Sequence, residues 1–159
     1  MSIRRVVVDA CVVLKWRLRD EEATAEADQL LADCLAGDLE VIAPALLDYE
    51  AGNALRVAAV RGRITQAEAV SAFTDTGSIE FARYPFDTTR SSAFAFAFEH
   101  NRSVYDAAYL ALAAAHGVPL YTGDRALCQS VAARLQWVRW IGGYRLADVP
   151  ELPENGPQA

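Results

Sequence analysis

Short apolar segments typical of buried strands alternate with longer helical patterns along nearly the whole chain. The strand-like segments lie at 5–8, 39–43, 79–84, 118–121 and 137–141. Helical patterns cover 21–36, 44–61, a segment that starts with the capping box at 65–68, then 88–100, 103–116 and 125–135. Such alternation is typical of units in which consecutive strands run parallel. The sequence therefore predicts an α/β fold, a three-layer α/β/α sandwich with a mainly parallel five-stranded sheet.

The end of the chain differs in composition from the rest. With 159 residues, 53% of them hydrophobic, the chain can bury the core of one domain. From Asp148 it reads DVPELPENGPQA, which is polar and rich in proline and has little apolar surface to bury. We therefore predict a folded domain over 1–147 and a disordered tail over 148–159.

The N-terminal segment MSIRRVVVDACVVLKW has two arginines ahead of an apolar run, as a signal peptide would. Asp9 and Lys15 interrupt that run and no small-residue cleavage site follows, so we expect no signal peptide. No apolar run reaches the length of a membrane span. The cysteines show no CxxC spacing and indicate free thiols; they are Cys11, Cys34 and Cys128. We expect a cytoplasmic protein with no membrane partner.

The formal net charge is −6, from 15 basic and 21 acidic residues, and at first argues against a nucleic-acid partner. The charge is unevenly distributed, since eight acids and no lysine or arginine lie between Asp20 and Glu40. Basic residues gather in two other places instead: Arg4, Arg5, Lys15, Arg17 and Arg19, then Arg56, Arg61 and Arg63. The charge thus permits a polyanionic substrate without indicating one.

Four acidic residues fall where the predicted strands end or soon after. Asp9 directly follows the first strand, and Asp124 directly follows the fourth. Glu50 lies in the helix after the second strand, within PALLDYEAGNAL, and Asp106 lies in the first turn of the apolar helix 103–116. In open parallel sheets, sites form outside the carboxyl ends of the strands. We therefore expect these four side chains to gather at that edge.

Two of these acids also have a purely structural interpretation. Ser103 and Asp106 match a capping box, and Asp124 precedes a helix as an N-cap would. Glu50 is harder to explain in this way, because it lies on the apolar stripe of its helix. A carboxylate on that face needs a partner, and the only lysine, Lys15, is far away in the sequence.

Four carboxylates at one edge would repel one another, by about 4 kcal/mol per pair at about 4 Å and an effective dielectric constant of about 20. Either some are protonated or a divalent cation holds them. Carboxylates and water form the all-oxygen site that suits Mg²⁺ or Mn²⁺. The two histidines, His100 and His116, are too few and too poorly spaced for zinc. The pattern thus favours a magnesium or manganese site.

The segments VVVDACVVLKW, APALLDYEAGNAL and SVYDAAYLALAAAHGVPLYTGDRAL, in this order, resemble the PIN-domain ribonucleases, particularly the VapC-like toxins of toxin–antitoxin pairs. The resemblance runs from about Val6 to Trp140. It implies an α/β/α fold with the nuclease domain over 1–147, Mg²⁺- or Mn²⁺-dependent endonuclease activity on RNA, a homodimer, and inhibition by a cognate antitoxin protein. It also implies that the catalytic, metal-binding acids are Asp9, Glu50, Asp106 and Asp124.

The resemblance extends to neighbouring positions, with two departures. Asn53 matches the asparagine usual in the family, and Thr122 matches the threonine that precedes the last acid. Cys11 stands where a serine is usual, which replaces a good hydroxyl partner with a weak donor. Gly123 stands where alanine is commoner, which should loosen the loop that carries Asp124. Neither departure removes a carboxylate.

From the residues and the resemblance together we predict metal-assisted hydrolysis of RNA phosphodiester bonds. Asp9, Asp106 and Asp124 would supply direct or water-bridged ligands. Glu50 would be either a ligand or the base that orients the water. Candidates for holding the RNA backbone are Arg17, Arg19, Arg56 and Arg61, although each could equally lie on a solvated helix face.

The alternative is a non-catalytic module that uses the acids to bind Mg²⁺ or a partner. Receiver-like domains place paired acids after the first strand, whereas Asp9 here has Val8 and Ala10 as neighbours. The chain lacks GxGxxG, GxxxxGK[ST] and GxSxG, which argues against dinucleotide binders, P-loop proteins and serine hydrolases.

Three phenylalanines occupy alternate positions of the predicted helix 88–100, at Phe94, Phe96 and Phe98. Residues two apart on a helix point in different directions, so these rings cannot all face one core. We therefore expect one or two of them to contact another chain in a homodimer.

Overall fold

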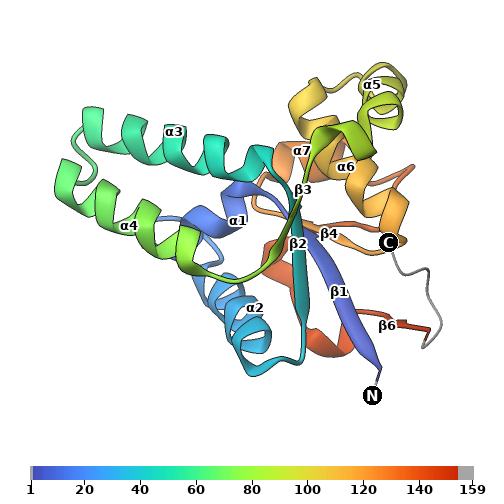
Figure 1. Cartoon of the computed structure of the whole chain (residues 1–159), viewed down its shortest axis with the longest axis horizontal. Coiled ribbons are helices and arrows are strands. Elements are labelled where there is room, and N and C mark those ends of the chain that lie inside the picture. The colour runs from blue at the N-terminus through green and yellow to red at the C-terminus, as the bar shows by residue number, and fades with distance from the viewer. Residues whose placement is uncertain (1, 154–159) are drawn as a thin grey trace.

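The computed structural model describes residues 2–153, in which a sheet of six strands forms the centre of the molecule (Figure 1). The strands are β1 (Ile3–Val8), β2 (Glu40–Pro44), β3 (Ala82–Tyr84), β4 (Leu120–Thr122), β5 (Val138–Trp140) and β6 (Glu151–Leu152). The first five pair in parallel in the order β3-β2-β1-β4-β5, and β6 pairs antiparallel with β1. The predicted α/β class and mainly parallel sheet are confirmed.

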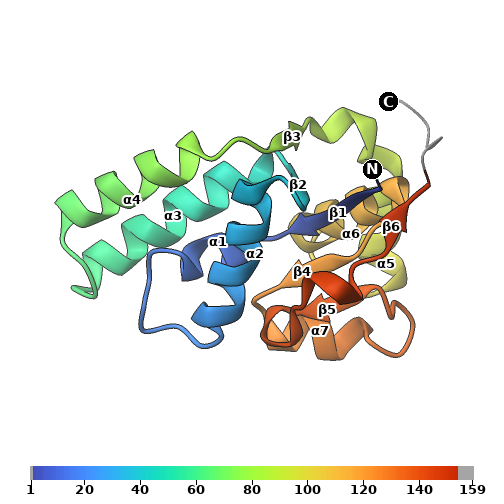
Figure 2. The same cartoon turned by 90° about the horizontal axis from the view of Figure 1, so that it is seen from below.

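Helices connect the strands and cover both faces of the sheet. The α-helices within the described part are α1 (Ala10–Lys15), α2 (Thr24–Ala36), α3 (Leu46–Val60), α4 (Gln66–Ser78), α5 (Arg90–Glu99), α6 (Val104–His116) and α7 (Arg125–Val131). Short 3₁₀-helices follow β3 and β5: η1 (Phe86–Thr88), η2 (Ile141–Gly143) and η3 (Leu146–Asp148). Figures 1 and 2 show α2 and α6 on opposite sides of the sheet. Right-handed crossovers require this, because the chain moves from β1 towards β3 and then reverses towards β5.

Helix α6 is the most deeply buried helix, as its apolar composition predicts. Every residue from Ala107 to Ala113 is buried, and α6 packs against β1, β2 and β4. It begins where the Ser103 hydroxyl oxygen accepts the backbone N–H of Asp106 at 3.1 Å. It ends at Gly117, whose φ of 64° is a left-handed conformation that glycine adopts without strain.

Helix α1 has no counterpart among the predicted elements. It starts immediately after β1, and Asp9 is its N-cap, with the carboxylate accepting the backbone N–H of Val12 at 3.1 Å. The six helical residues include two adjacent valines, which favour strand over helix. Burial of Val12 and Val13 against the sheet outweighs that preference here.

The structure differs from the predicted tail boundary. Asp148 ends η3, Val149 is buried, and Glu151–Leu152 forms β6. Arg4 anchors this segment, because its Nε donates to the Val149 carbonyl at 3.2 Å and its Nη2 to Glu151 at 2.7 Å. Pairing with the first residues of β1 thus orders a segment whose composition suggested disorder. The rest of the predicted tail, 154–159, lies outside the described residues.

Helices α3 and α4 form an arm that projects from the sheet (Figures 1 and 2). The predicted capping box starts α4: the Thr65 hydroxyl accepts the Glu68 N–H at 3.1 Å, and the Glu68 carboxylate accepts the Thr65 N–H at 2.6 Å. Arg63, in the turn between the helices, bonds Asp20 at 2.7 Å and Glu21 at 2.9 Å. These pairs tie the arm to the acidic segment between α1 and α2.

Candidate active site

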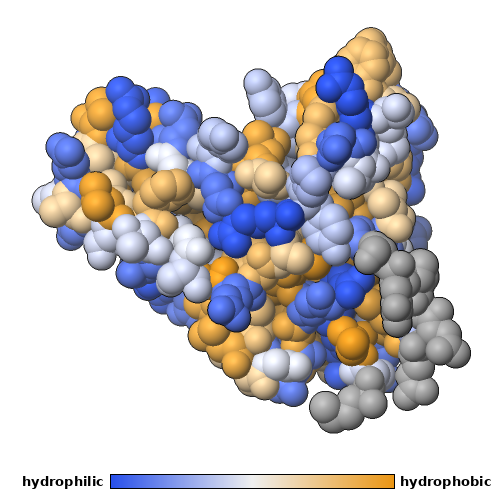
Figure 3. Space-filling view, viewed as in Figure 1, coloured by the Kyte–Doolittle hydropathy of each residue, from blue (hydrophilic) through white to orange (hydrophobic). Residues whose placement is uncertain are grey.

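The four predicted acids lie around the carboxyl ends of β1 and β4. Asp9 follows β1 and Asp124 follows β4, and these adjacent strands are where the strand order reverses direction. That crevice is where open α/β sheets bind their ligands. Glu50 in α3 and Asp106 in α6 come from the two helical units that flank it, and Figure 3 shows the surface hollowed between the α3–α4 arm and the α5–α6 hairpin.

Asp9 is buried, and uncharged donors hold both of its carboxylate oxygens. Oδ1 accepts the backbone N–H groups of Val12 and Gly123, at 3.1 and 3.3 Å, and Oδ2 accepts the hydroxyl of Thr122. Burial raises the pKa of Asp9 to about 6, assisted by the negative charge of Asp124 and opposed by these hydrogen bonds. The carboxylate is thus well oriented but poorly compensated in charge.

Thr122 links two of the acids. Its side chain is fully buried, and its hydroxyl donates to Asp9 while accepting the backbone N–H of Asp124 at 2.9 Å. The Asp124 Oδ1 accepts the N–H of Leu127 at 3.0 Å and so caps α7, as one interpretation of the sequence predicted. Capping uses only one oxygen: Oδ2 of Asp124 has no hydrogen-bond partner within residues 2–153. Capping and a role in the site are therefore compatible.

The Glu50 side chain reaches from α3 to Tyr109 in the middle of α6. The Tyr109 hydroxyl, on a residue only 3% exposed, donates to the Glu50 Oε1 at 2.6 Å. Burial and the charge of Asp106 raise the pKa of Glu50, against the lowering effect of this bond. Sequence reasoning missed Tyr109, although its place one turn after Asp106 on an otherwise apolar helix is a usable signal.

Asp106 does not use its carboxylate to cap α6. The Ser103 hydroxyl provides the cap, and the Asp106 Oδ2 instead accepts two bonds from Arg102, from Nε at 3.1 Å and from Nη2 at 2.8 Å. Among the ion pairs of the described chain, this is the one that involves any of the four acids. Arg102 was not among the residues that the sequence singled out.

The remaining predicted neighbours, Asn53 and Cys11, are both exposed. Asn53 lies on α3. Cys11 lies beside the acids: desolvation, followed by the charges of Asp9, Asp124 and Glu50, raises the pKa of its thiol to about 12. The thiol therefore stays protonated at neutral pH, with the weak hydrogen-bonding capacity expected for cysteine.

Gly123 does not loosen its loop, contrary to our expectation. A Cβ there would lie 2.8 Å from the Cys11 Cβ and 2.8 Å from the Cε of Lys15, which is closer than real contacts allow. The absence of a side chain lets the loop pack directly on α1, and Lys15 is itself buried, with Nζ bonded to the Glu22 carbonyl at 2.7 Å. Glycine thus permits the close approach that carries the Gly123 N–H to Asp9.

The donor set fits a hard divalent cation, but the site is not preassembled. Within residues 2–153, no group of three or more His, Cys, Asp or Glu side chains is arranged to hold a metal. Each of the four carboxylates is turned towards a partner in the protein. Burial is the main cause of the raised pKa values of Asp9 and Glu50, and the charges of Asp124 and Asp106, respectively, add to it. Asp106 and Asp124 are partly buried and each has one carboxylate oxygen without a hydrogen-bond partner within residues 2–153, and such oxygens are the ligands that Mg²⁺ and Mn²⁺ prefer.

The predicted RNA-contacting arginines divide into two pairs. Arg17 bonds Asp75 at 3.0 Å, and Arg19 bonds both carboxylate oxygens of Asp28, at 2.8 and 2.9 Å. Arg56 and Arg61 are exposed on α3 and just after its end. The second pair is thus the better placed to meet a solvated polyanion.

Comparison with known proteins identifies the family. The PIN-domain family matches residues 6–132. This chain belongs to the PIN-domain family. Ribonuclease VapC1 of Mycobacterium tuberculosis is 36% identical to this PIN domain over 120 residues, which cover 76% of this chain and 90% of the relative. Ribonuclease VapC12 of the same organism is 34% identical over 125 residues, covering 79% and 91%. The chain is thus a VapC-like member of the PIN ribonucleases.

Two solved structures share the fold of this PIN domain. PAE2754 from Pyrobaculum aerophilum superposes with a TM-score of 0.58 at 26% identity, over 82% of this chain and 87% of its own. VapC20 of Mycobacterium tuberculosis, described as a toxin that cleaves the sarcin–ricin loop, superposes with a TM-score of 0.61 over 84% and 98%. At 17% identity, the second likeness bears on the fold alone.

Proposed function

We propose that this endoribonuclease depends on a divalent metal, Mg²⁺ or Mn²⁺, held by Asp9, Glu50, Asp106 and Asp124, and acts as the toxin of a toxin–antitoxin pair. The observation that supports the proposal is the placement of four carboxylates around the sheet's switch point, three of them held only by neutral donors. Carboxylates without counter-ions attract a cation. The relatives of this PIN domain are named ribonucleases, which supports the nuclease part of the proposal.

The residues of the site would each have a defined task. A bound Mg²⁺ supplies an activated water and stabilises negative charge on the attacked phosphate. Thr122 and Tyr109 hold Asp9 and Glu50 in fixed orientations, as second-layer partners of metal ligands do. Burial raises the pKa of Asp9 to about 6, and a cation beside the carboxylate would favour its ionised form.

RNA would reach the site through the hollow between the α3–α4 arm and the α5–α6 hairpin (Figure 3). Arg56 and Arg61 lie on the arm and are free to contact phosphates, whereas Arg17 and Arg19 would first have to leave their carboxylate partners. We expect the arm to contribute more to RNA affinity than the segment between α1 and α2.

A homodimer and an antitoxin complete the proposal. Phe94 is 58% exposed and Phe98 is 76% exposed, and the two rings meet edge to face with their centroids 5.1 Å apart. Phe96 is half-buried and stacks on His100, so it is accounted for within the chain. Phe94 and Phe98 are therefore the rings we expect in the dimer. Light scattering at micromolar concentration should give a dimer, and a monomer would contradict this part.

The expected place of action is the cytoplasm, where RNA is available. No helix of the described chain is long and apolar enough to cross a membrane. The three cysteines are unpaired, which suits a reducing compartment.

Incubation with labelled RNA tests the central claim. Cleavage should require Mg²⁺ or Mn²⁺ and stop when EDTA is added. In a parallel thermal melt without RNA, Mg²⁺ at about 100 times its Kd should stabilise the fold by about 2.7 kcal/mol, or about 5–10 °C in Tm for a chain of this size. A Mg²⁺-induced shift without cleavage would instead favour the non-catalytic binding module, and cleavage in EDTA would refute the metal dependence.

A further inference from the structure

Arg102 contacts the candidate site in a way that the proposed chemistry does not require. It lies in the turn between α5 and α6, and its Nε and Nη2 both bond the Oδ2 of Asp106, at 3.1 and 2.8 Å. Both side chains are largely withdrawn from solvent, at 24% and 29% exposed. The other oxygen, Oδ1, has no hydrogen-bond partner in the described part of the chain.

Backbone contacts hold both members of the pair in place. Asn101 adopts a left-handed conformation with φ of 50°, and the Arg102 N–H donates to the Ala97 carbonyl at 3.0 Å, which closes the end of α5. On the other side, the Ser103 hydroxyl binds the N–H of Asp106. The guanidinium and the carboxylate are therefore presented to each other by two fixed helix ends.

Helix stability does not explain the pair. A cation at the N-terminal end of α6 faces the positive end of the helix dipole, which is an unfavourable position for arginine. The cap is already supplied by Ser103. A partly exposed pair of this spacing contributes well under about 1 kcal/mol to folding.

The surroundings of Asp106 suggest another role. Hydroxyl or backbone donors hold Asp9, Glu50 and Asp124, and none of the three forms an ion pair within residues 2–153. Arg102 is the one cation of the described chain that pairs with a member of the cluster. A positive charge fixed there reduces repulsion among the acids when no metal is present. The same charge must oppose a divalent cation that arrives beside Asp106.

We propose that Arg102 is a positioning residue that acts as the internal counter-cation of the metal site: it holds Asp106 through Oδ2, leaves Oδ1 for the metal, and lowers the affinity of the site for that metal. This inference rests on the proposed metal dependence. Its consequence is a site whose acids are partly neutralised when it is empty and whose metal exchanges readily.

Metal affinity without RNA tests the inference. Arg102→Gln keeps a polar side chain but removes the charge, so Mn²⁺ should bind about tenfold more tightly by isothermal titration calorimetry, the change expected when one unit charge near a divalent ion is lost. The metal-free variant should melt at a lower temperature than the wild type, and its Mn²⁺-induced shift in Tm should be larger. Arg102→Lys retains the charge and should bind Mn²⁺ within about twofold of the wild type, although lysine cannot reproduce the two-bond geometry.

Arg4→Gln is the matched control. It removes the same charge and breaks an ion pair of 2.7 Å, but at the opposite edge of the sheet, so Mn²⁺ affinity should not change. If Arg102→Gln does not fold, Arg102→Met removes the charge while it retains most of the aliphatic stem. Unchanged or weaker Mn²⁺ binding in the charge-removing variant would overturn the role of Arg102 and leave the metal site standing. A wild type that binds no Mn²⁺ would overturn both.

Discussion

Both ends of β1 carry charged side chains, but the charges are satisfied differently. At the amino end, Arg4 pairs with Glu151 and Arg5 pairs with Glu40, each at 2.7 Å. At the carboxyl end, a hydroxyl and two backbone N–H groups hold Asp9. An ion pair neutralises the charge of its carboxylate, whereas neutral donors leave a carboxylate without a counter-ion. The carboxyl end is therefore the one that can attract a metal ion.

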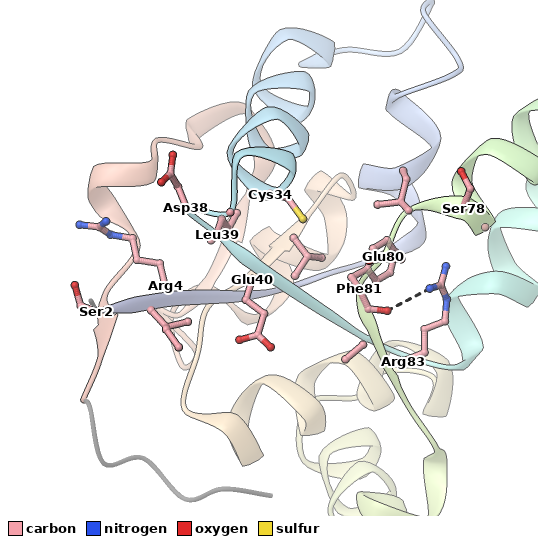
Figure 4. A pocket seen from close by; sticks show the side chains of 16 residues that line it. Ser2, Arg4, Cys34, Asp38, Leu39, Glu40, Ser78, Glu80, Phe81 and Arg83 are labelled. Carbon is pink, nitrogen blue, oxygen red and sulfur yellow. Dashed lines mark hydrogen bonds between the residues drawn. The ribbon is translucent and has the colours of Figure 1, made fainter.

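A cavity at the amino edge of the sheet lacks this imbalance of charge. A cavity of about 1120 Å³ lies at the amino edge, between the end of α2, β2 and the segment before β3 (Figure 4). Side chains of both signs line it, and three of its charged residues are already paired: Arg4 with Glu151, Glu40 with Arg5, and Arg83 with Asp48 at 2.6 Å. The cavity therefore offers less unbalanced charge than the carboxyl end of β1.

Asp124→Asn should produce the largest effect and tests the carboxyl end directly. Asparagine caps helices about as well as aspartate, so α7 should remain intact. Loss of a ligand charge should lower the cleavage rate by about 100-fold or more at saturating Mg²⁺, since even outer-layer changes at metal sites cost about 10–100-fold. The metal-free variant should melt at the same temperature as the wild type or higher, because like-charge repulsion is relieved. If Asp124→Asn cleaves RNA as fast as the wild type and shows the same Mg²⁺-induced shift in Tm, the only role of Asp124 is to cap α7.

Truncation after Ala147 tests whether the amino end contributes stability rather than activity. It removes the buried Val149 and the pairing of β6 with β1, which should lower the free energy of unfolding by about 2–3 kcal/mol. A chain that ends at Pro153 is the control in urea denaturation. Where both chains are folded, their cleavage rates should agree. Equal stabilities would restore the original prediction that the segment from Asp148 contributes nothing to the fold.

The pH dependence of the free energy of unfolding should show that burial of the Asp9 carboxylate without a counter-ion is costly. Burial raises the pKa of Asp9 from 3.8 to about 6, so its protonated form favours folding. That contribution is full below about pH 4 and is lost as the pH rises through about 6. In EDTA, the wild type should therefore lose about 1.4 kcal/mol more than Asp9→Asn between pH 5 and pH 7.5, as measured by urea unfolding. If the free energies of unfolding of the wild type and Asp9→Asn change in parallel with pH, ionisation of Asp9 does not destabilise the fold.

The smallest effect is expected from Glu40→Gln at the amino end. Its pair with Arg5 is 24% and 40% exposed, and such pairs contribute about 0–1 kcal/mol to stability. The cleavage rate and the Mg²⁺-induced shift in Tm should match those of the wild type. A loss of cleavage comparable to that of Asp124→Asn would mean that the two ends of the strand are not as distinct as their charge pairing indicates.

Local patterns were sufficient for most of the fold. Apolar runs and capping residues predicted the first five strands and the long helices, because the spacing of buried positions along the chain reflects the geometry of the element itself. Helix α1 and strand β6 were missed, since both depend on contacts with residues elsewhere: Val12 and Val13 on the sheet, and Glu151 on Arg4. Short segments with weak or contrary local preferences take their conformation from those contacts.

The sequence by itself determined which carboxylates follow the parallel strands, and hence which edge of the sheet is acidic. Only the tertiary structure decided the partner of each carboxylate. Asp9 meets Thr122 across 113 positions and Glu50 meets Tyr109 across 59, distances at which no periodic pattern carries information. Arg102 lies only four residues before Asp106, so the sequence could have suggested that the two side chains pair. The spacing alone does not show that α6 starts between the two residues, nor that both side chains face the site. Chain geometry places an acid at a strand end, whereas packing between distant elements decides whether its charge is cancelled or kept.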